Sequence, residues 1–326
     1  MDKRQLTSAL IKEWSLAHEV DLVGVASADE MNAHPPDPEW PQTPQRIWPG
    51  CRSLVALAKR IPQGMFLAHD LTAKLSTPHL IMNTLDNIAL GLSYFIEESG
   101  YHAFPAPQQL TDLGLKRGTY GPLSLRHIAV EAGLGTLGLN MMLLTPGFGP
   151  RVYLSAVLTD ADLEPDHRQE KRLCRGTACS RCLLACPPDA VGNWSLDKRR
   201  CSTHAQRFGA GAFLTHIENL LSVKEEEARR QLVRSPQMVG LWQALRTGAG
   251  AYGGCPRCIE VCPVGESYGI HLKERHSQIP EVTPEKMRKR ADMRRQERNG
   301  VGAPALVHSD RWVGKAMIRT RDTRKN

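Results

Sequence analysis

The sequence predicts an α+β (mixed α/β) fold made of two different parts. In the first half of the 326-residue chain, short apolar segments alternate with segments of helical apolar spacing. In the second half, eight of the nine cysteines lie in two dense runs and one single position between them. We therefore expect an α/β domain over 1–165, a cysteine-rich domain over 166–275 and a basic C-terminal extension over 276–326. Alternating strands and helices, followed by two apolar runs in succession, favour a mixed sheet rather than a purely parallel one.

The first domain is expected to begin with a helix, a strand and a long loop. Residues 6–20 have apolar positions at helical spacing, and the apolar run 21–27 follows as a short buried strand. The stretch 33–50 contains six prolines, which predicts irregular structure. A second apolar run, 53–61, predicts the next strand.

The rest of this domain supplies two further helices and three strands. Residues 79–100 form a strongly amphipathic segment that ends at a glycine, as helices commonly do. A strand is expected within 102–107, and a second helix with the same glycine stop over 125–133. Two apolar runs flank Pro-Gly-Phe-Gly-Pro in 141–160, which predicts a β-hairpin.

The cysteine runs have the spacing of iron–sulfur ligands. The residues concerned are Cys174-x4-Cys179-x2-Cys182-x3-Cys186-Pro187, then Cys201, then Cys255-x2-Cys258-x3-Cys262-Pro263. Each run ends in Cys-Pro, the pattern of bacterial ferredoxins, in which the last cysteine of a run binds the other cluster. Eight thiolates are what two [4Fe–4S] clusters require. A mostly helical insert, with helices expected at 215–221 and 225–233, separates the two runs.

The crossing pattern assigns the eight cysteines to two groups of four. One cluster would use Cys174, Cys179, Cys182 and Cys262, and the other Cys186, Cys201, Cys255 and Cys258. The first gap has four residues where bacterial ferredoxins have two, and a gap of four also occurs in [2Fe–2S] proteins, so the nuclearity of that centre stays open. A four-thiolate zinc site is the alternative, but it leaves four cysteines and both Cys-Pro endings without a role. Cys51 is interpreted as a buried structural thiol.

The charge and the N-terminus bear on partners and location. The net charge of +8 is concentrated in 271–326. This excess fits a solvated extension lying across the surface or a docking surface for an acidic electron donor such as a ferredoxin or flavodoxin. The most basic stretch, 286–298, has no aromatic residue and no nucleic-acid motif, so we do not expect a nucleic acid as partner. There is no secretory signal, twin-arginine pair or membrane span, and we expect a cytoplasmic protein without a membrane partner.

One glycine motif matches a dinucleotide fingerprint only by letter. Gly133-x-Gly135-x-x-Gly138 follows a predicted helix and precedes a predicted strand, whereas the fingerprint follows a strand and opens a helix. We instead interpret these glycines as points where the backbone closely approaches a neighbouring element or a flat cofactor.

Taken together, these motifs resemble the superfamily of epoxyqueuosine reductases and reductive dehalogenases, which are cobalamin-dependent double-[4Fe–4S] reductases. The carriers of the resemblance are DLVGVAS, PGCRSLVALA, GPLSLRHIAVEAGLGTLGLN, LLTPGFGP, VLTD and the paired cysteine runs with Cys201. The resemblance covers roughly residues 6–270. It implies a nitroreductase-like α/β domain that binds a base-off cobalamin, joined to a bacterial-ferredoxin-like double-cluster module.

The resemblance also implies positions for the site residues. Those expected to line the cobalamin are Arg126, Gly133, Gly135, Gly138 and Asn140. Epoxyqueuosine reductases carry a proton-donating acidic residue just before the proline matched by Pro122, and a lysine where this chain has Leu139. Gly118-Thr119-Tyr120-Gly121 contains no carboxylate. Reductive dehalogenases use a tyrosine, so Tyr120 is either the general acid or a structural tyrosine.

Three hypotheses follow for function. The main one is a cobalamin- and iron–sulfur-dependent oxidoreductase that cleaves a carbon–heteroatom bond in a small organic substrate, as reductive dehalogenases do. The alternatives are an electron-transfer protein that reduces a partner's corrinoid, and a tRNA-modifying enzyme similar to epoxyqueuosine reductase.

Overall fold

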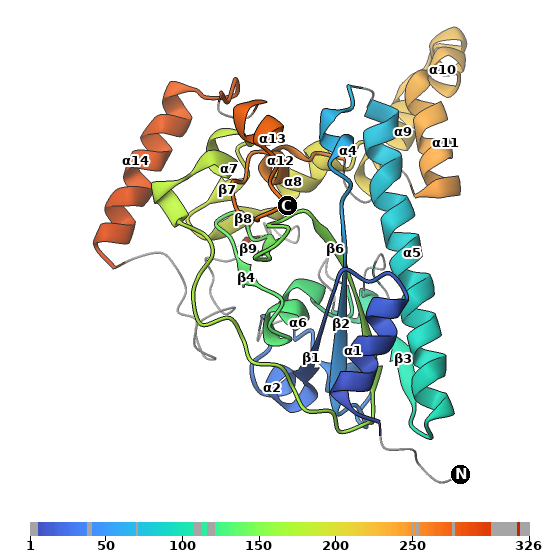
Figure 1. Cartoon of the computed structure of the whole chain (residues 1–326). Helices are drawn as coiled ribbons and strands as arrows, with labels where there is room; N and C mark the ends of the chain where they lie inside the picture. Colours follow the sequence, from blue (N-terminus) through green and yellow to red (C-terminus); the bar gives the residue numbers. More distant parts are fainter. Residues whose placement is uncertain are drawn as a thin grey trace.

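The computed structural model describes residues 6–37, 41–69, 71–106, 108, 112–115, 121–248, 251, 254–275, 278–300 and 318–319. It confirms the mixed helix and sheet class (Figure 1).

A four-stranded sheet forms the centre of the first half. Its order is β1 (Leu22–Ser27), β2 (Ser53–Arg60), β6 (Val152–Thr159) and β3 (Ala103–Pro105). All three neighbouring pairs are antiparallel, not mixed as we expected. The reason lies in the connections. The segment between β1 and β2 leaves and re-enters the sheet at one end, where it forms α2 (Ala28–Ala33) and, within the stretch expected to be loop, α3 (Pro44–Ile47).

Alternation along β2 divides the core into two layers. Leu54, Ala56 and Ala58 pack towards α6 (Leu125–Glu131), while Val55 and Leu57 pack towards α1 (Ser8–Ala17) and α5 (Leu71–Glu98). Figure 1 shows α1 and α5 together on one side of the sheet, with α6 on the other. The sheet is therefore buried on both faces, as its apolar strands predicted.

The long helix begins earlier than predicted. Helix α5 starts at Leu71 and contains Pro78, which we had placed before the helix. A proline removes one backbone hydrogen bond, whereas Leu85, Leu92 and Ile96 are fully buried along the rest of the 28-residue helix. Short helical turns, α4 (Gly64–Leu67) and η1 (Leu113–Leu115), lie on either side of it in the sequence.

The predicted hairpin over 141–160 is wrong in its pairing. Strand β5 (Leu143–Leu144) pairs with β4 (Thr136–Leu137), whereas β6 is flanked by β2 and β3. Only one bridge, Thr145 to Gly149, links the two runs. Because β6 has a partner on both edges, β5 has no free edge of β6 to join.

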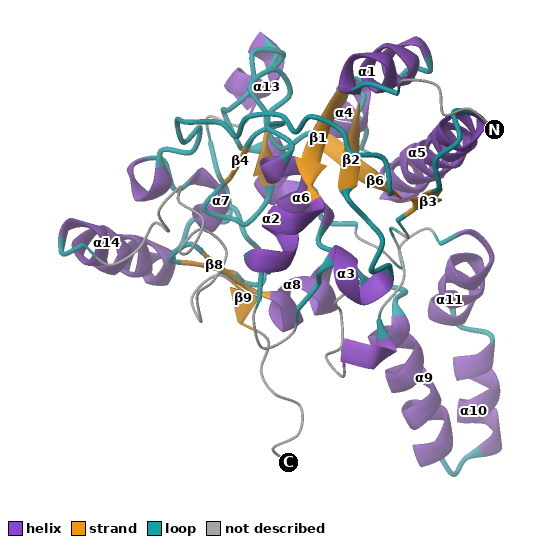
Figure 2. Cartoon of the chain, turned by 90° about the horizontal axis from the view of Figure 1, so that it is seen from below, coloured by secondary structure: helices purple, strands orange, loops and turns teal. Residues whose placement is uncertain are grey.

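The cysteine-rich part is built mainly of short elements around loops. In chain order these are η2 (Gly176–Ala178), α7 (Arg181–Leu184), β7 (Val191–Gly192), β8 (Ser195–Asp197), α8 (Lys198–Ala205), α12 (Arg257–Glu260) and α13 (Ile270–Arg275). The insert forms α9 (Ala210–Ser222), α10 (Glu226–Val233) and α11 (Pro236–Thr247). These three helices project from the rest of the molecule (Figure 2).

The C-terminal helix packs against this part. Helix α14 (Pro284–Arg298) places Met293, 4% exposed, in a small core with Leu183 and Trp194. The Nζ atom of buried Lys286 donates to the backbone oxygens of Leu184 and Glu281, each at 2.9 Å. A two-residue strand, β9 (Ile318–Arg319), lies parallel to β8. The basic excess of the sequence thus includes a helix that is part of the packed structure.

Candidate metal centre

The seven cysteines of the two runs and Cys201 are free of disulfides. Several of them lie close enough together to affect one another's pKa. Burial raises the pKa of Cys182 well above its usual value, and the charges of neighbouring cysteines raise it further; those neighbours are Cys258, Cys174, Cys262 and Cys179. Burial likewise raises the pKa of Cys262 to about 11, with Cys174 and Cys179 adding to the effect. Cys174, Cys179, Cys182 and Cys262 also line one small cavity, and we refer to these four as the first group.

The second group is assembled in the same way. Burial raises the pKa of Cys258 to about 12, with further contributions from Cys201, Cys255 and Cys186. Burial raises the pKa of Cys201 to about 11, again with Cys186 and Cys255 nearby. These proximities are compatible with the crossing pattern, and the assignment of the eight cysteines to two clusters stays a prediction. Thiols with such raised pKa values are protonated near neutral pH, so iron would have to displace their protons on binding.

Backbone N–H groups point at the sulfur atoms. The N–H groups of Leu139 and Gly176 each donate to Cys174 Sγ at 3.4 Å, and that of Ala190 donates to Cys186 Sγ at 3.2 Å. Hydrogen bonds to the ligand sulfurs are among the features that set iron–sulfur reduction potentials. A small cavity is lined by all four cysteines of the first group together with Leu139 and Asn140. The donor set and its surroundings fit iron–sulfur clusters.

The zinc alternative needs a tighter arrangement. A zinc ion binds four sulfurs at about 2.3 Å each. Within the described residues, which include all nine cysteines, no group of three or more His, Cys, Asp or Glu side chains is placed to hold a single metal ion.

Asn140 lies where the two groups meet. It is 4% exposed, lines the cavity of the first group, and hydrogen-bonds the Cys258 thiol of the second, an interaction that lowers the pKa of Cys258. Its Nδ2 also donates to the Cys258 backbone oxygen at 3.5 Å. The charge of Cys258 acts on Cys182, so this pair spans the two groups. We had expected Asn140 beside cobalamin; the structure places it beside thiols.

Arg126 lies beside the second group. Its Nη1 donates to the Met141 backbone oxygen at 2.5 Å, and its positive charge lowers the pKa of Cys201. The neighbouring His127 is 3% exposed, and burial followed by the charge of Arg126 lowers its pKa to about 3. Helix α6 therefore brings the α/β domain into contact with the second cysteine group.

The predicted glycines approach the protein's own backbone. Helix α6 precedes them, β4 lies between Gly135 and Gly138, and β5 follows, so these glycines do not connect a strand to a helix as the dinucleotide fingerprint does. A Cβ on Gly133, whose φ is +74°, would lie 2.4 Å from the His167 oxygen. One on Gly135 would lie 2.0 Å from the Leu144 oxygen, and one on Gly138 would lie 3.0 Å from Asn140 Oδ1. We had interpreted these glycines as points of close approach to a neighbouring element or to a flat cofactor. The contacts show close approach to neighbouring elements of the protein.

Tyr120 and Cys51 are the two remaining residues for which the sequence predicted a role. Tyr120 lies outside the described residues. Cys51 is 6% exposed, and burial raises its pKa to about 11, in keeping with a structural thiol.

Arg151 was missed by the sequence reasoning. It is 3% exposed at the start of β6, and it donates to the backbone oxygens of Ile259, Cys262 and Val264 at 3.4, 3.0 and 2.6 Å. It thereby ties the sheet to the second cysteine run. In the sequence, Arg151 is recognisable only as an arginine next to an apolar strand. Its hydrogen-bond partners lie more than 100 residues away, so local spacing does not reveal them.

The sequence of the chain is similar to those of two kinds of reductase. No family model matches the chain. The chain is 26% identical over 312 residues to an epoxyqueuosine reductase from Bacillus cereus, covering 86% of the chain and 70% of the relative. The corresponding enzyme from Bacillus subtilis is 27% identical over 308 residues, with 86% and 69% covered. A tetrachloroethene reductive dehalogenase from Dehalobacter restrictus is 29% identical over 146 residues, covering 37% of the chain and 24% of the relative.

Solved structures show the same two groups of proteins. An epoxyqueuosine reductase crystallised with an epoxyqueuosine-modified tRNA stem loop matches with a TM-score of 0.51 at 22% identity, covering 85% of this chain and 69% of that one. A catabolic reductive dehalogenase matches with a TM-score of 0.50 at 14% identity, covering 89% and 36%. These likenesses concern the fold.

The relatives define an oxidoreductase, as the sequence predicted. The chain is similar in sequence to epoxyqueuosine reductases and reductive dehalogenases, and its fold matches structures of both groups, which confirms the resemblance drawn from its motifs.

The expectation that nucleic acid is not a partner is wrong. The relatives matched over 86% of the chain are epoxyqueuosine reductases, and a neighbouring structure holds a tRNA stem loop. Our reasoning relied on the absence of a recognised motif, but proteins also bind RNA through its shape and phosphates. No helix in the described part of the chain is long and apolar enough to cross a membrane.

Proposed function

We propose that this chain is a reductase that carries two [4Fe–4S] clusters and a cobalamin and acts on a modified nucleoside in RNA, reducing a carbon–oxygen bond. The observation that carries the proposal is the grouping of eight thiols in the crossed pattern. The similarity to epoxyqueuosine reductases over 86% of the chain supports the choice of substrate class.

When bound, the clusters would supply single electrons and the cobalamin a reducible cobalt. Cys174, Cys179, Cys182 and Cys262 would hold one cluster, and Cys186, Cys201, Cys255 and Cys258 the other. The N–H groups of Leu139 and Ala190 would stabilise the charged sulfurs. Asn140 and the Cys182–Cys258 pair provide a short route between the two groups.

The cobalamin site remains a proposal from the resemblance. The spaces beside Gly133 and Gly135 are filled by the protein's own carbonyl groups, so no step is derived from them. The contact of Arg126 with the second cysteine group supports a cofactor on the α6 side of that group.

A second candidate function is reduction of a carbon–halogen bond in a small organic compound. It is favoured by two sequence observations, the lack of a carboxylate in 118–122 and the presence of Leu139 in place of lysine. Tyr120 is the proposed proton donor in either case. We expect Tyr120→Phe to lower turnover by about two to four orders of magnitude while the corrinoid content is unchanged. Unchanged turnover would remove this assignment.

The deciding experiment uses anaerobically reconstituted protein with a chemical reductant. Iron and corrinoid contents are measured first, with about eight irons and one cobalamin expected for each chain. Turnover is then compared between an epoxyqueuosine-containing anticodon stem-loop and a set of halogenated phenols. Reduction of the halogenated phenols alone would establish the second candidate. Full iron loading without corrinoid, and with neither substrate reduced, would instead support the electron-transfer alternative.

A further inference from the structure

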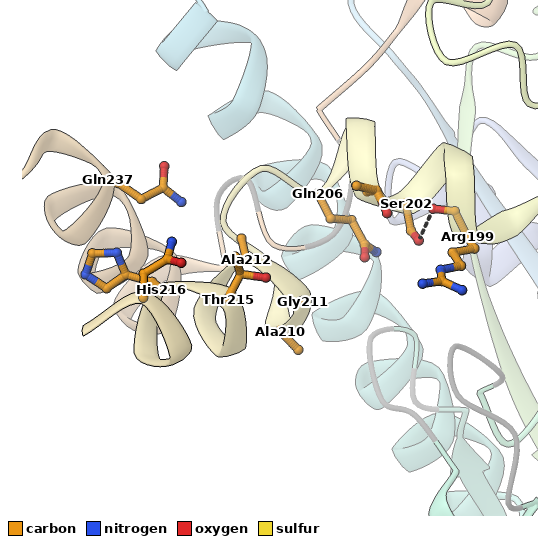
Figure 3. Close-up of a pocket in the computed structure, with 11 residues that line it drawn as sticks. Arg199, Ser202, Gln206, Ala210, Gly211, Ala212, Thr215, His216 and Gln237 are labelled. Carbon is orange, nitrogen blue, oxygen red and sulfur yellow. Dashed lines mark hydrogen bonds between the residues drawn. The ribbon is translucent and has the colours of Figure 1, made fainter. Parts of the chain in front are cut away.

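A hollow with several polar side chains in its lining lies between α8 and the projecting helices (Figure 3). Its volume of about 620 Å³ falls in the range of ~300–1,000 Å³ that is usual for ligand sites. Helix α8 and the turn after it contribute Arg199, Ser202, Thr203 and Gln206. Helix α11 contributes Gln237 from the opposite side.

Arg199 provides the positive charge. It is exposed, and its guanidinium forms no ion pair with any residue that the structure describes. A second hollow adjoins the first, because it is also lined by Arg199 and Thr203. The second hollow is lined as well by Arg200, His204 and the carboxylate of Asp197, which Arg200 approaches to 3.6 Å. The pair of hollows therefore has a net positive lining.

The first turn of α9 opens into the same hollow. Its N-cap is Gly209, which has no side chain to accept from the free N–H groups, and Ala210, Gly211 and Ala212 line the hollow. A Cβ built on Gly211 meets nothing within 4 Å, so the space in front of it is open. The first backbone N–H groups of a helix favour anions, through both hydrogen bonds and the helix dipole.

A buried histidine beside the hollow has a ring nitrogen that is unpaired among the described residues. His216 is 5% exposed and lines the hollow from α9 together with Thr215 and Asn219. Within the described part of the chain its buried Nε2 atom has no hydrogen-bond partner. Buried polar side-chain atoms usually have one.

We propose that this hollow binds the phosphodiester backbone of the RNA substrate, an inference that rests on the proposed function. Arginine, serine, threonine, asparagine, glutamine and helix N-termini are the groups with which proteins contact phosphate and sugar. The lining of the hollow consists largely of these groups. Helix α8 also carries Cys201, so RNA held here lies one helix away from the second cysteine group. Phosphate contacts would hold the RNA in position, and the modified nucleoside would be recognised elsewhere.

The test measures binding of a fluorescent anticodon stem-loop RNA to the reconstituted protein at several salt concentrations. Gly211→Asp places a carboxylate in the open space before the α9 N-terminus, where an acidic residue also favours the helix. Gly211→Ala is the matched control, since it adds only the Cβ. Arg199→Ala removes the cation, and Arg229→Ala is its control, because Arg229 is an exposed arginine of α10 outside the lining.

We expect Gly211→Asp to weaken RNA binding at least ~10-fold at low salt, while Gly211→Ala and Arg229→Ala bind as the wild type does. Arg199→Ala should weaken binding and reduce the slope of log affinity against log salt by about one. Iron and corrinoid contents should be equal in all variants, which excludes misfolding as the cause.

The proposal is overturned if Gly211→Asp and Arg199→Ala bind RNA normally, or if wild-type protein does not bind the stem-loop. Loss of binding to an acidic electron carrier alone would also overturn it, since the hollow would then dock a protein. If RNA binding depends on the residues of the hollow but the RNA is not reduced, the proposed function is contradicted and the phosphate-binding site is still supported.

Discussion

Glu297 of α14 holds the loop between the first two cysteines, and its removal should release the first cluster. Its carboxylate accepts hydrogen bonds from the Thr177 hydroxyl, from Trp194 Nε1 at 3.0 Å and from the Thr177 N–H at 3.4 Å. One turn earlier, Arg294 donates to the Thr177 oxygen at 3.1 Å. Thr177 lies in the four-residue gap that distinguishes this run from bacterial ferredoxins, and it is 2% exposed.

The magnitude follows from the three hydrogen bonds. Bonds to a charged acceptor contribute about 1.5–3 kcal/mol each, and they are not additive around one group. We expect Glu297→Ala to weaken the attachment of the loop by roughly 3–5 kcal/mol. A loss of about 3 kcal/mol corresponds to a factor of roughly 100 in the population of the open loop. The first cluster should therefore lose its iron about 100-fold faster.

The assay follows iron release from anaerobic, reconstituted protein to a chelator. About half of the iron should be lost quickly, while the second cluster keeps its half and serves as an internal reference. The control is Glu285→Ala, since Glu285 is exposed at the other end of α14 and pairs with Arg288 on the same helix. Iron release from Glu297→Ala at the rate of the control would refute the reasoning.

The remaining predictions concern three buried side chains. Burial raises the pKa of Glu131 from 4.5 to about 7, Arg168 lowers it and Glu30 raises it. The folded protein thus keeps a proton that the unfolded chain releases, so stability should fall by about 3 kcal/mol as the pH rises from 4.5 through 7. Glu131→Gln should remove this slope in urea titrations, and an unaltered slope would contradict the assignment. Asn140→Leu removes a hydrogen bond to the Cys258 sulfur and should lower the reduction potential of the second cluster, as measured in EPR redox titrations. A change in the reduction potential of the first cluster alone would show that Asn140 acts on that cluster instead. Arg151→Met removes the hydrogen bonds from Arg151 to the backbone oxygens of Cys262 and Val264, and that to Ile259, whose oxygen keeps the Cys262 N–H as a donor. It should destabilise the protein by roughly 3–5 kcal/mol. An equal denaturation midpoint would show that the link between sheet and cysteine run is dispensable.

Local patterns in the sequence were sufficient for most elements. Apolar spacing located β1, β2 and α6 almost to the residue, because each buries one or two faces whose periodicity is visible in the letters. The same patterns failed for the hairpin predicted over 141–160. Two apolar runs beside a turn do not reveal whether each run pairs with the other or with strands elsewhere in the chain. They also failed at Pro78, where burial further along α5 outweighs one lost hydrogen bond.

The candidate site was predictable to the extent that it depends on short loops. Each cysteine run contains one pair of cysteines separated by only two residues. Such a short loop keeps the two thiols of a pair close together, whatever the position of the loop in the fold. Asn140, Arg151 and Glu297 act through partners more than 100 residues away, and no periodicity reports such contacts.

By itself the sequence determined most element types, the spacing of the cysteines and the resemblance to epoxyqueuosine reductases and reductive dehalogenases, since these depend on residue chemistry and local spacing. Only the tertiary structure decided which strands pair, that α14 closes over the first cysteine loop, and that the glycines after α6 admit backbone rather than open space. It also placed Arg199 and the start of α9 around one hollow. These features arise from contacts between distant segments, and their geometry is settled only when the whole chain packs.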